Sequence, residues 1–112
     1  MENNKFTYSM VISGCLALIN ERRGGTNRSL LAGAGIPTGT WSRITRGQAH
    51  FQIEQLRAGC GEVAIMPAML TTFADGACRD LVLREGLEWT SDTGARTVPF
   101  AALCFLIGKL GY

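Results

Sequence analysis

The sequence predicts an all-α protein, in which five short helices are followed by a C-terminal extension that ends in an apolar helix. Apolar residues recur three or four positions apart in successive windows, which is the spacing of one helix face. Glycine or proline separates one window from the next. A chain of 112 residues with 46% hydrophobic content can also bury a core without metal or disulfide bonds. We expect a first unit at residues 1–74 and an extension at residues 75–112 that serves dimerisation or packing.

The first helix is expected at residues 7–23. Its apolar side chains form a single stripe, and the Gly24-Gly25 pair ends it. This helix can pack across the back of the next two helices, which are too short to be stable alone. The stripe consists of Tyr8, Val11, Ile12, Cys15 and Ile19.

Residues 26–47 predict two short helices joined by a tight turn. Thr26 can cap the first of them, because its hydroxyl can accept a hydrogen bond from a free backbone N–H of the first turn. Gly35 is expected to end that helix with a positive φ, and Ile36 can fill the gap before the next helix. The apolar positions at helical spacing are Leu30, Leu31 and Ala34.

The second helix of this pair is expected at residues 38–45, with Pro37 suited to its first turn. Trp41 and Ile44 lie three residues apart and therefore share the face toward the core. The other side chains of the helix remain on the surface. Two helices in this order form a helix-turn-helix pattern, whose second helix is free to enter a DNA groove.

Two further helices are expected after a polar loop. Residues 51–63 show one apolar face, and Pro67 can open a helix at residues 67–74. We expect that helix to end there, because Asp75 and Gly76 interrupt the pattern. The apolar face of residues 51–63 is made by Ile53, Leu56, Cys60 and Val63.

The C-terminal part divides into three segments. Residues 77–89 fit a helix, through Leu81 and Val82, or an alternating strand, through Leu81 and Leu83, and both remain open with helix or irregular structure favoured. Residues 90–97 are a polar loop. Residues 99–110 form a helix that is apolar almost all round, with Thr97 available as a cap, so that this helix must dock on its own domain or pair with a second copy.

Charge is unevenly distributed along the chain. The net charge is +2 overall, but residues 1–57 carry seven Lys or Arg against three Glu, whereas the remainder carries four bases against six acids. An excess of positive charge around the two-helix unit favours a phosphate-bearing partner.

The four cysteines are widely spaced and His50 is the only histidine, so neither a metal site nor any other cofactor is expected. We interpret Cys15 and Cys60 as small apolar core residues in a reducing cytoplasm. None of the catalytic motifs with a recognised mechanism is present, and we do not expect an enzyme.

A short match to a lipoprotein cleavage box occurs at Ile12-Ser13-Gly14-Cys15. Glu2 is the wrong charge for a leader, and polar residues interrupt the apolar segment before it. The apolar run at residues 98–108 is too short to span a bilayer, which takes about 20 residues. We therefore expect a soluble, cytoplasmic protein that does not contact a membrane.

Several short motifs follow one another without a gap: Thr26-Asn27, Leu30-Leu31, Ala34-Gly35-Ile36, Thr40-Trp41-Ser42-Arg43-Ile44, Arg46-Gly47 and Ile53-Glu54-Gln55-Leu56. In these motifs the chain resembles the Cro/lambda-repressor type of helix-turn-helix domain, the xenobiotic-response-element family. With the first and fifth helices, the resemblance covers residues 7–74 and implies the five-helix domain of that family. The chain departs from the family pattern at Asn27, Leu31, Gly39 and Phe51.

The resemblance implies that helix 38–45 lies in the major groove of double-stranded DNA. Arginine can donate two hydrogen bonds to guanine, and a threonine methyl can contact the methyl of thymine. Base readout would then fall to Thr38, Gly39, Thr40 and Arg43. Phosphate contacts would fall to Asn27, Arg28, Arg46 and Gln48.

The implied function is sequence-specific transcriptional regulation, by a dimeric repressor of phage, plasmid or antitoxin style. One unit reads only a few base pairs, so we expect two copies on a two-fold site. The alternative is an adaptor or antitoxin that uses the same scaffold to bind another protein, and a protein partner or inducer is compatible with both. The predicted pairing surface is Phe100, Leu103, Phe105, Leu106, Ile107 and Leu110.

Overall fold

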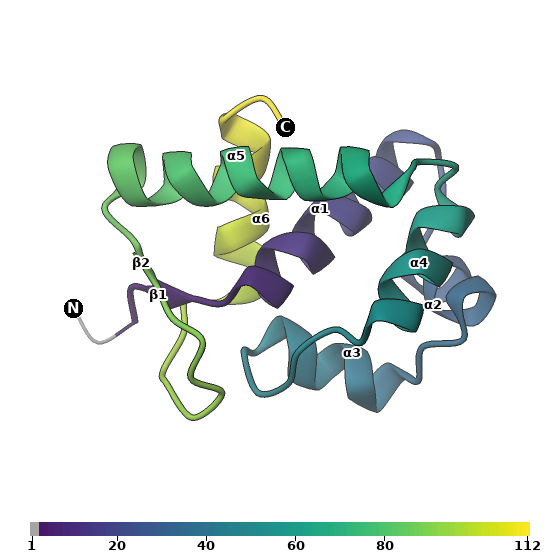
Figure 1. The fold of residues 1–112 in the computed structure, drawn as a ribbon, viewed down its shortest axis with the longest axis horizontal. Coiled ribbons are helices and arrows are strands. Elements are labelled where there is room, and N and C mark those ends of the chain that lie inside the picture. The colour runs from purple at the N-terminus through teal and green to yellow at the C-terminus, as the bar shows by residue number, and fades with distance from the viewer. Residues whose placement is uncertain (1–2) are drawn as a thin grey trace.

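The computed structural model describes residues 3–112, which form six helices and two very short strands (Figure 1). This confirms the prediction of a mainly helical protein. The elements in chain order are β1 (Lys5–Phe6), α1 (Tyr8–Arg22), α2 (Asn27–Ala34), α3 (Thr38–Thr45), α4 (Ile53–Glu62), α5 (Pro67–Glu85), β2 (Glu88–Trp89) and α6 (Phe100–Lys109).

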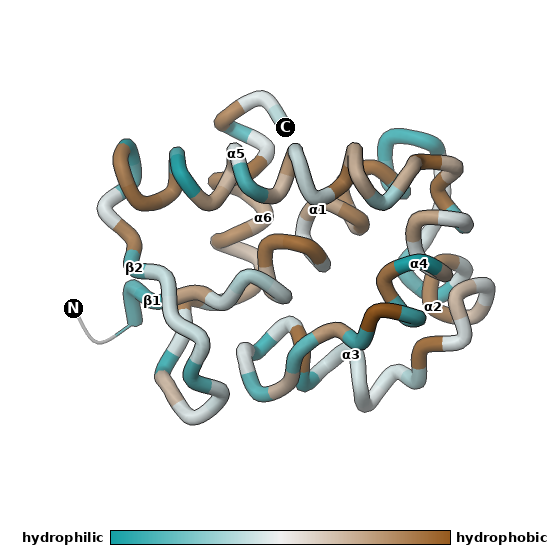
Figure 2. The backbone as a smooth tube through the Cα atoms, viewed as in Figure 1, coloured by the Kyte–Doolittle hydropathy of each residue, from teal (hydrophilic) through white to brown (hydrophobic). Residues whose placement is uncertain are grey.

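Helix α1 is the centre of the molecule. It contacts α2, α3, α5 and α6, and its residues 9–16 are all buried. Figure 1 shows α5 along one side of α1, with α3 and α4 toward the opposite side. Hydrophobic residues gather along α1 and α6, whereas the loop between β2 and α6 is mostly polar (Figure 2). One shared core therefore holds the first and last helices together.

The expected two-helix unit has the predicted boundaries. The Thr26 hydroxyl accepts a hydrogen bond from the Ser29 backbone N–H at 3.1 Å, which caps α2. Gly35 ends α2 with a φ of 69°, and Ile36 is buried behind it. Helix α3 covers residues 38–45 as predicted, with Pro37 as its N-cap.

The predicted end of the fifth helix at Ala74 is wrong, because α5 continues without interruption to Glu85. The Tyr8 hydroxyl donates to a carboxylate oxygen of Asp75 at 2.8 Å. A Cβ at Gly76 would lie 2.8 Å from the Tyr112 hydroxyl oxygen, so the absence of a side chain admits the C-terminal residue. These distant contacts offset the roughly 1 kcal/mol that glycine costs inside a helix. The division proposed at residue 74 consequently falls within α5.

Two short strands follow from pairing between distant segments: β1, which was not predicted, and β2, which ends the segment left open between helix and strand. β1 and β2 are parallel, with Lys5 opposite Glu88 and Phe6 opposite Trp89. The other edge of β1 meets the segment before α6, where the Val98 backbone N–H donates to the Lys5 carbonyl at 2.9 Å. Residues 77–85 are thus helical, and only the last part of the uncertain segment is a strand.

Helix α6 docks on its own chain. Leu103 and Ile107 are fully buried, and a Cβ at Gly14 of α1 would lie 3.0 Å from the Ile107 Cδ1 atom. Leu103 and Ile107 are therefore removed from the predicted pairing surface. Phe105 is 70% exposed, and Phe100, Leu106 and Leu110 are half-buried. Thr97 does not cap the helix, because Pro99 occupies the N-cap position, and the Thr97 hydroxyl donates to the Arg46 carbonyl.

Cys15 and Cys60 lie in the core, as the sequence predicted. All four cysteines carry free thiols, and burial raises the pKa of Cys15 and of Cys78 to about 12. Residues 12–15, which match a lipoprotein cleavage box, are consecutive buried positions of α1. Within residues 3–112, no helix combines the length and apolarity needed to cross a membrane.

Replacing a buried residue of α6 tests its docking. Leu103→Ala should lower the free energy of unfolding by about 2–5 kcal/mol, because it leaves a cavity in the core. Phe105→Ala, on the outer face of the same helix, should change it by about 0.5 kcal/mol or less. Urea denaturation followed by circular dichroism measures both. Equal losses in the two variants would show that α6 is docked differently.

Candidate nucleic-acid interface

The segment that forms α2 and α3 is basic and contains no acidic residue, although the Glu62 carboxylate of α4 lies against Gly33 of α2. From Arg22 to Ile53 the chain contains five arginines and no Asp or Glu. Arg28, Arg43 and Arg46 are all exposed. The ion pairs found within residues 3–112 lie elsewhere, between α5 residues and between α5 and α6. These three guanidinium groups are thus available to an external anion.

The start of α2 carries the first two predicted phosphate residues. Asn27 and Arg28 are exposed in the first turn. The Asn20 side-chain amide of α1 donates to the Thr26 carbonyl at 2.8 Å. A Cβ at Gly25 would lie 2.4 Å from the Asn20 amide oxygen, so the chain passes tightly against α1 here. α1 thereby fixes where α2 begins.

The four residues predicted for base readout lie along α3. Thr38, Gly39 and Arg43 are exposed, and Thr40 is half-buried. Gly39 and Arg43 are four residues apart and Thr40 and Arg43 three, so they share the outer side of the helix. Nothing lies within 4 Å of a Cβ built on Gly39, so packing does not require a glycine there. This outer side is open to a partner.

The inner side of α3 is held by aromatic packing. Trp41 is buried, as predicted, and Ile44 is completely inaccessible. The Trp41 ring meets Phe51 and Phe100 edge to face, with centroids 6.3 Å from it in each case and interplanar angles of 76° and 83°. Such pairs contribute about 0.5–1.5 kcal/mol each beyond area burial. Rings from the loop before α4 and from α6 therefore set the rotation of α3.

The end of α3 is fixed by a segment far along the chain. The Thr97 hydroxyl donates to the Arg46 carbonyl at 3.0 Å. Gly47 has a φ of 76°, and a Cβ there would lie 2.7 Å from the Thr97 methyl carbon. The Arg46 Nε–H donates to the Ser42 carbonyl at 3.3 Å, which directs the guanidinium along the helix. Arg46 and the exposed Gln48 therefore lie on either side of a constrained turn at Gly47.

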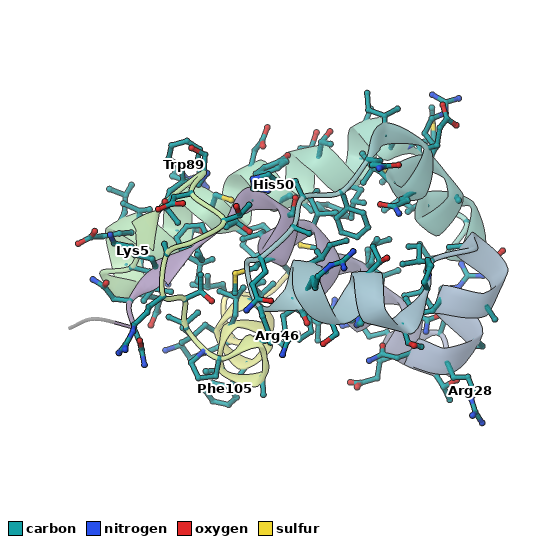
Figure 3. All side chains as sticks on the ribbon, turned by 90° about the horizontal axis from the view of Figure 1, so that it is seen from below. Lys5, Arg28, Arg46, His50, Trp89 and Phe105 are labelled. Carbon is teal, nitrogen blue, oxygen red and sulfur yellow. The ribbon has the colours of Figure 1, made fainter. Side chains whose placement is uncertain are left out.

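Figure 3 views the molecule from below, where Arg28 and Arg46 lie at opposite ends of the α2–α3 unit. Arg46 borders the loop that leads to α6. An open groove of about 500 Å³ lies there, and it also contains Arg96. Sequence reasoning missed Arg96, because nothing in the local pattern at residues 90–97 associates it with a helix fifty positions earlier. The other main lining residues are Asn3, Gln48, Thr97 and Phe100.

His50 lies in the loop after α3, as predicted, and joins two other segments. Its Nδ1 atom is 3.5 Å from the Ser9 hydroxyl of α1, and its Nε2 atom is 3.2 Å from the Ser91 carbonyl. Ser9 also accepts a hydrogen bond from the Phe51 backbone N–H at 2.9 Å. These contacts brace the loop. No group of three or more metal-ligating residues occurs within residues 3–112.

Two glycine substitutions test the turn after α3. Gly47→Ala should lower the free energy of unfolding by at least about 1 kcal/mol, because a side chain there has a strained φ and meets Thr97. Gly39→Ala is the matched control and should be neutral or stabilising by up to about 1 kcal/mol. Thermal denaturation of both variants makes the comparison. A fully tolerated Gly47→Ala would mean that Thr97 does not pack against this turn.

Comparisons with protein-family models, with curated protein sequences and with solved structures find no match to this chain.

Proposed function

We propose that this protein is a sequence-specific DNA-binding regulator of the Cro/lambda-repressor helix-turn-helix type. The observation that carries the proposal is the α2–α3 pair, whose inner side is anchored by Trp41 and whose outer side is exposed and free of acidic residues. A short helix held from behind, with Arg43 on its outer side and Arg46 just beyond its end, suits insertion into the major groove.

In this proposal, α3 approaches the base edges through Thr38, Gly39, Thr40 and Arg43. Arg43 donates two hydrogen bonds to the O6 and N7 atoms of guanine, a contact that discriminates against other bases by about 1–3 kcal/mol. The threonine methyl groups suit the thymine methyl. Gly39 presents bare backbone, which lets α3 approach the bases closely.

Backbone phosphates would be held at both ends of the two-helix unit. Asn27 and Arg28 lie at the start of α2, where the free N–H groups of the first turn also favour an anion. Arg46 and Gln48 lie beyond the end of α3. Contacts on both sides of the reading helix fix its register on the duplex without selecting a sequence themselves.

Single arginine variants test this assignment. Arg43→Ala should weaken binding to a duplex selected from a random pool by about 1–3 kcal/mol and relax preference at one base position. Arg46→Ala should weaken binding to all duplexes alike and reduce the slope of log K against log salt by about 1. Fluorescence anisotropy at several salt concentrations gives both quantities.

Arg84 on α5 offers a matched control, because it is exposed on an element that lies across α1 from α3 (Figure 1). Arg84→Ala should leave the affinity unchanged. If the Arg43 and Arg46 variants bind like the wild type, the assignment of α3 to the DNA groove fails.

We further propose that the protein acts as a dimeric repressor. One α3 helix reads only a few base pairs, so two copies one helical turn apart would supply the affinity and spacing that a specific site needs. On α6, Phe105 is the large apolar side chain left exposed after docking, with Phe100, Leu106 and Leu110 half-buried.

The dimer is tested by introducing charge on this outer face. Phe105→Asp should shift a dimer to a monomer in multi-angle light scattering, because burying an unpaired carboxylate at an interface is costly. The circular dichroism spectrum should not change, since Phe105 is exposed in the single chain. A wild-type protein that stays monomeric both free and on DNA would contradict dimerisation.

A second candidate function is that of an adaptor or antitoxin that binds another protein. It is favoured by Met66, Met69 and Phe73, which are 70%, 52% and 37% exposed at or near the start of α5. Their spacing of three and four residues gives one apolar stripe. Duplex binding that is weak and insensitive to salt would favour this alternative over the first.

A further inference from the structure

The groove beside the end of α3 has an unbalanced positive charge. It takes in residues 45, 46 and 48 on one side and residues 94–100 on the other, with Asn3 at its edge. Arg46 and Arg96 both line it, and no lining residue is acidic. Neither arginine takes part in an ion pair within residues 3–112. Asp92, the acid closest to Arg96 in sequence, accepts a hydrogen bond from the Gly94 backbone N–H at 2.8 Å.

The backbone that carries the two arginines is held by contacts of the two residues that follow Arg96. Its neighbour Thr97 donates its hydroxyl to the Arg46 carbonyl at 3.0 Å, which ties the loop directly to the end of α3. The next backbone N–H, that of Val98, donates to the Lys5 carbonyl at 2.9 Å. Because these bonds are formed before any ligand arrives, a ligand that bridges the two guanidinium groups does not have to order the loop first.

The chemistry of the groove suits a phosphate group. Guanidinium donors form paired hydrogen bonds with phosphate oxygens, and Gln48 and Asn3 add amide groups at the same groove. The groove is open to solvent rather than enclosed, so a polymer backbone can pass along it. Figure 1 shows the loop before α6 reaching the same side of the molecule as α3.

We propose that Arg46 and Arg96 together hold a backbone phosphate of the duplex that α3 reads, so that the loop at residues 90–97 is part of the DNA interface. This inference rests on the proposed function. Arg46 connects the helix that reads the bases with the groove, because it lies at the end of α3 and lines the groove. The loop lengthens the phosphate contact beyond the helix-turn-helix unit and does not change which bases are read.

Arg96→Ala tests the inference, with Arg84→Ala as the matched control. Each phosphate contact contributes about 0.9 to the slope of log K against log salt. Between 50 and 200 mM salt, the Arg96 variant should therefore lose about 3.5-fold less affinity than the wild type. The change should be the same on a selected duplex and on an unrelated one, and the Arg84 variant should match the wild type.

A second variant tests the position of the groove without changing charge. Thr97→Val removes the hydroxyl that bonds to the Arg46 carbonyl but keeps the shape of the side chain. It should weaken duplex binding at low salt. Urea denaturation of both variants shows whether a change in binding reflects a loss of folding, and Arg96 is exposed, so its replacement should leave stability unchanged.

The outcomes separate the two proposals. If the wild type binds duplex DNA with a steep salt dependence and Arg96→Ala behaves identically, the inference is wrong and the proposed function stands. If no duplex is bound, both fail. If inorganic pyrophosphate shifts the NMR signals of Arg46 and Arg96 while Arg96→Ala leaves DNA binding intact, the groove takes a free phosphate compound, which also overturns the inference.

Discussion

The edge-to-face packing of Trp41 against Phe51 and Phe100 is the contact on which the candidate interface depends. α3 has only eight residues, fewer than an isolated helix needs to persist in water. Its outer side can present polar groups in a fixed direction only because its inner side is anchored. Since one of the two anchoring rings comes from α6, the rotation of α3 is set partly by the end of the chain.

The C-terminal extension is thus integral to the same packed body. α5 continues through residue 74 without a break, and α6 buries two side chains in the core. The Thr97 hydroxyl donates to the carbonyl of Arg46, the C-cap residue of α3. Because the α2–α3 pair is supported by residues so far along the sequence, changes outside the pair can alter its position. Residues 90–100 would in this way influence the DNA binding proposed for α3 without contacting a base themselves.

Local chemistry explains which features could be predicted from the sequence. The Thr26 cap, the Gly35 stop and the bounds of α3 depend on neighbouring residues, and all three were predicted correctly. α5 was predicted to end too early, because the contacts that compensate for Gly76 come from Tyr8 and Tyr112. The residues predicted to contact DNA are exposed, apart from the half-buried Thr40. Arg96 lies at the same groove as Arg46 only through tertiary packing, which no local pattern encodes.

β1 has a consequence for how the chain folds. Lys5 and Phe6 pair with residues 88 and 89, and Lys5 also pairs with Thr97. Both edges of β1 therefore pair only with residues from the last quarter of the sequence. Contacts with such sequence separation carry a large loop-closure entropy and form late. During synthesis, α1 through α4 can be made while their central core is still open on one side. We therefore expect the core around α1 to be completed only after α6 has been made.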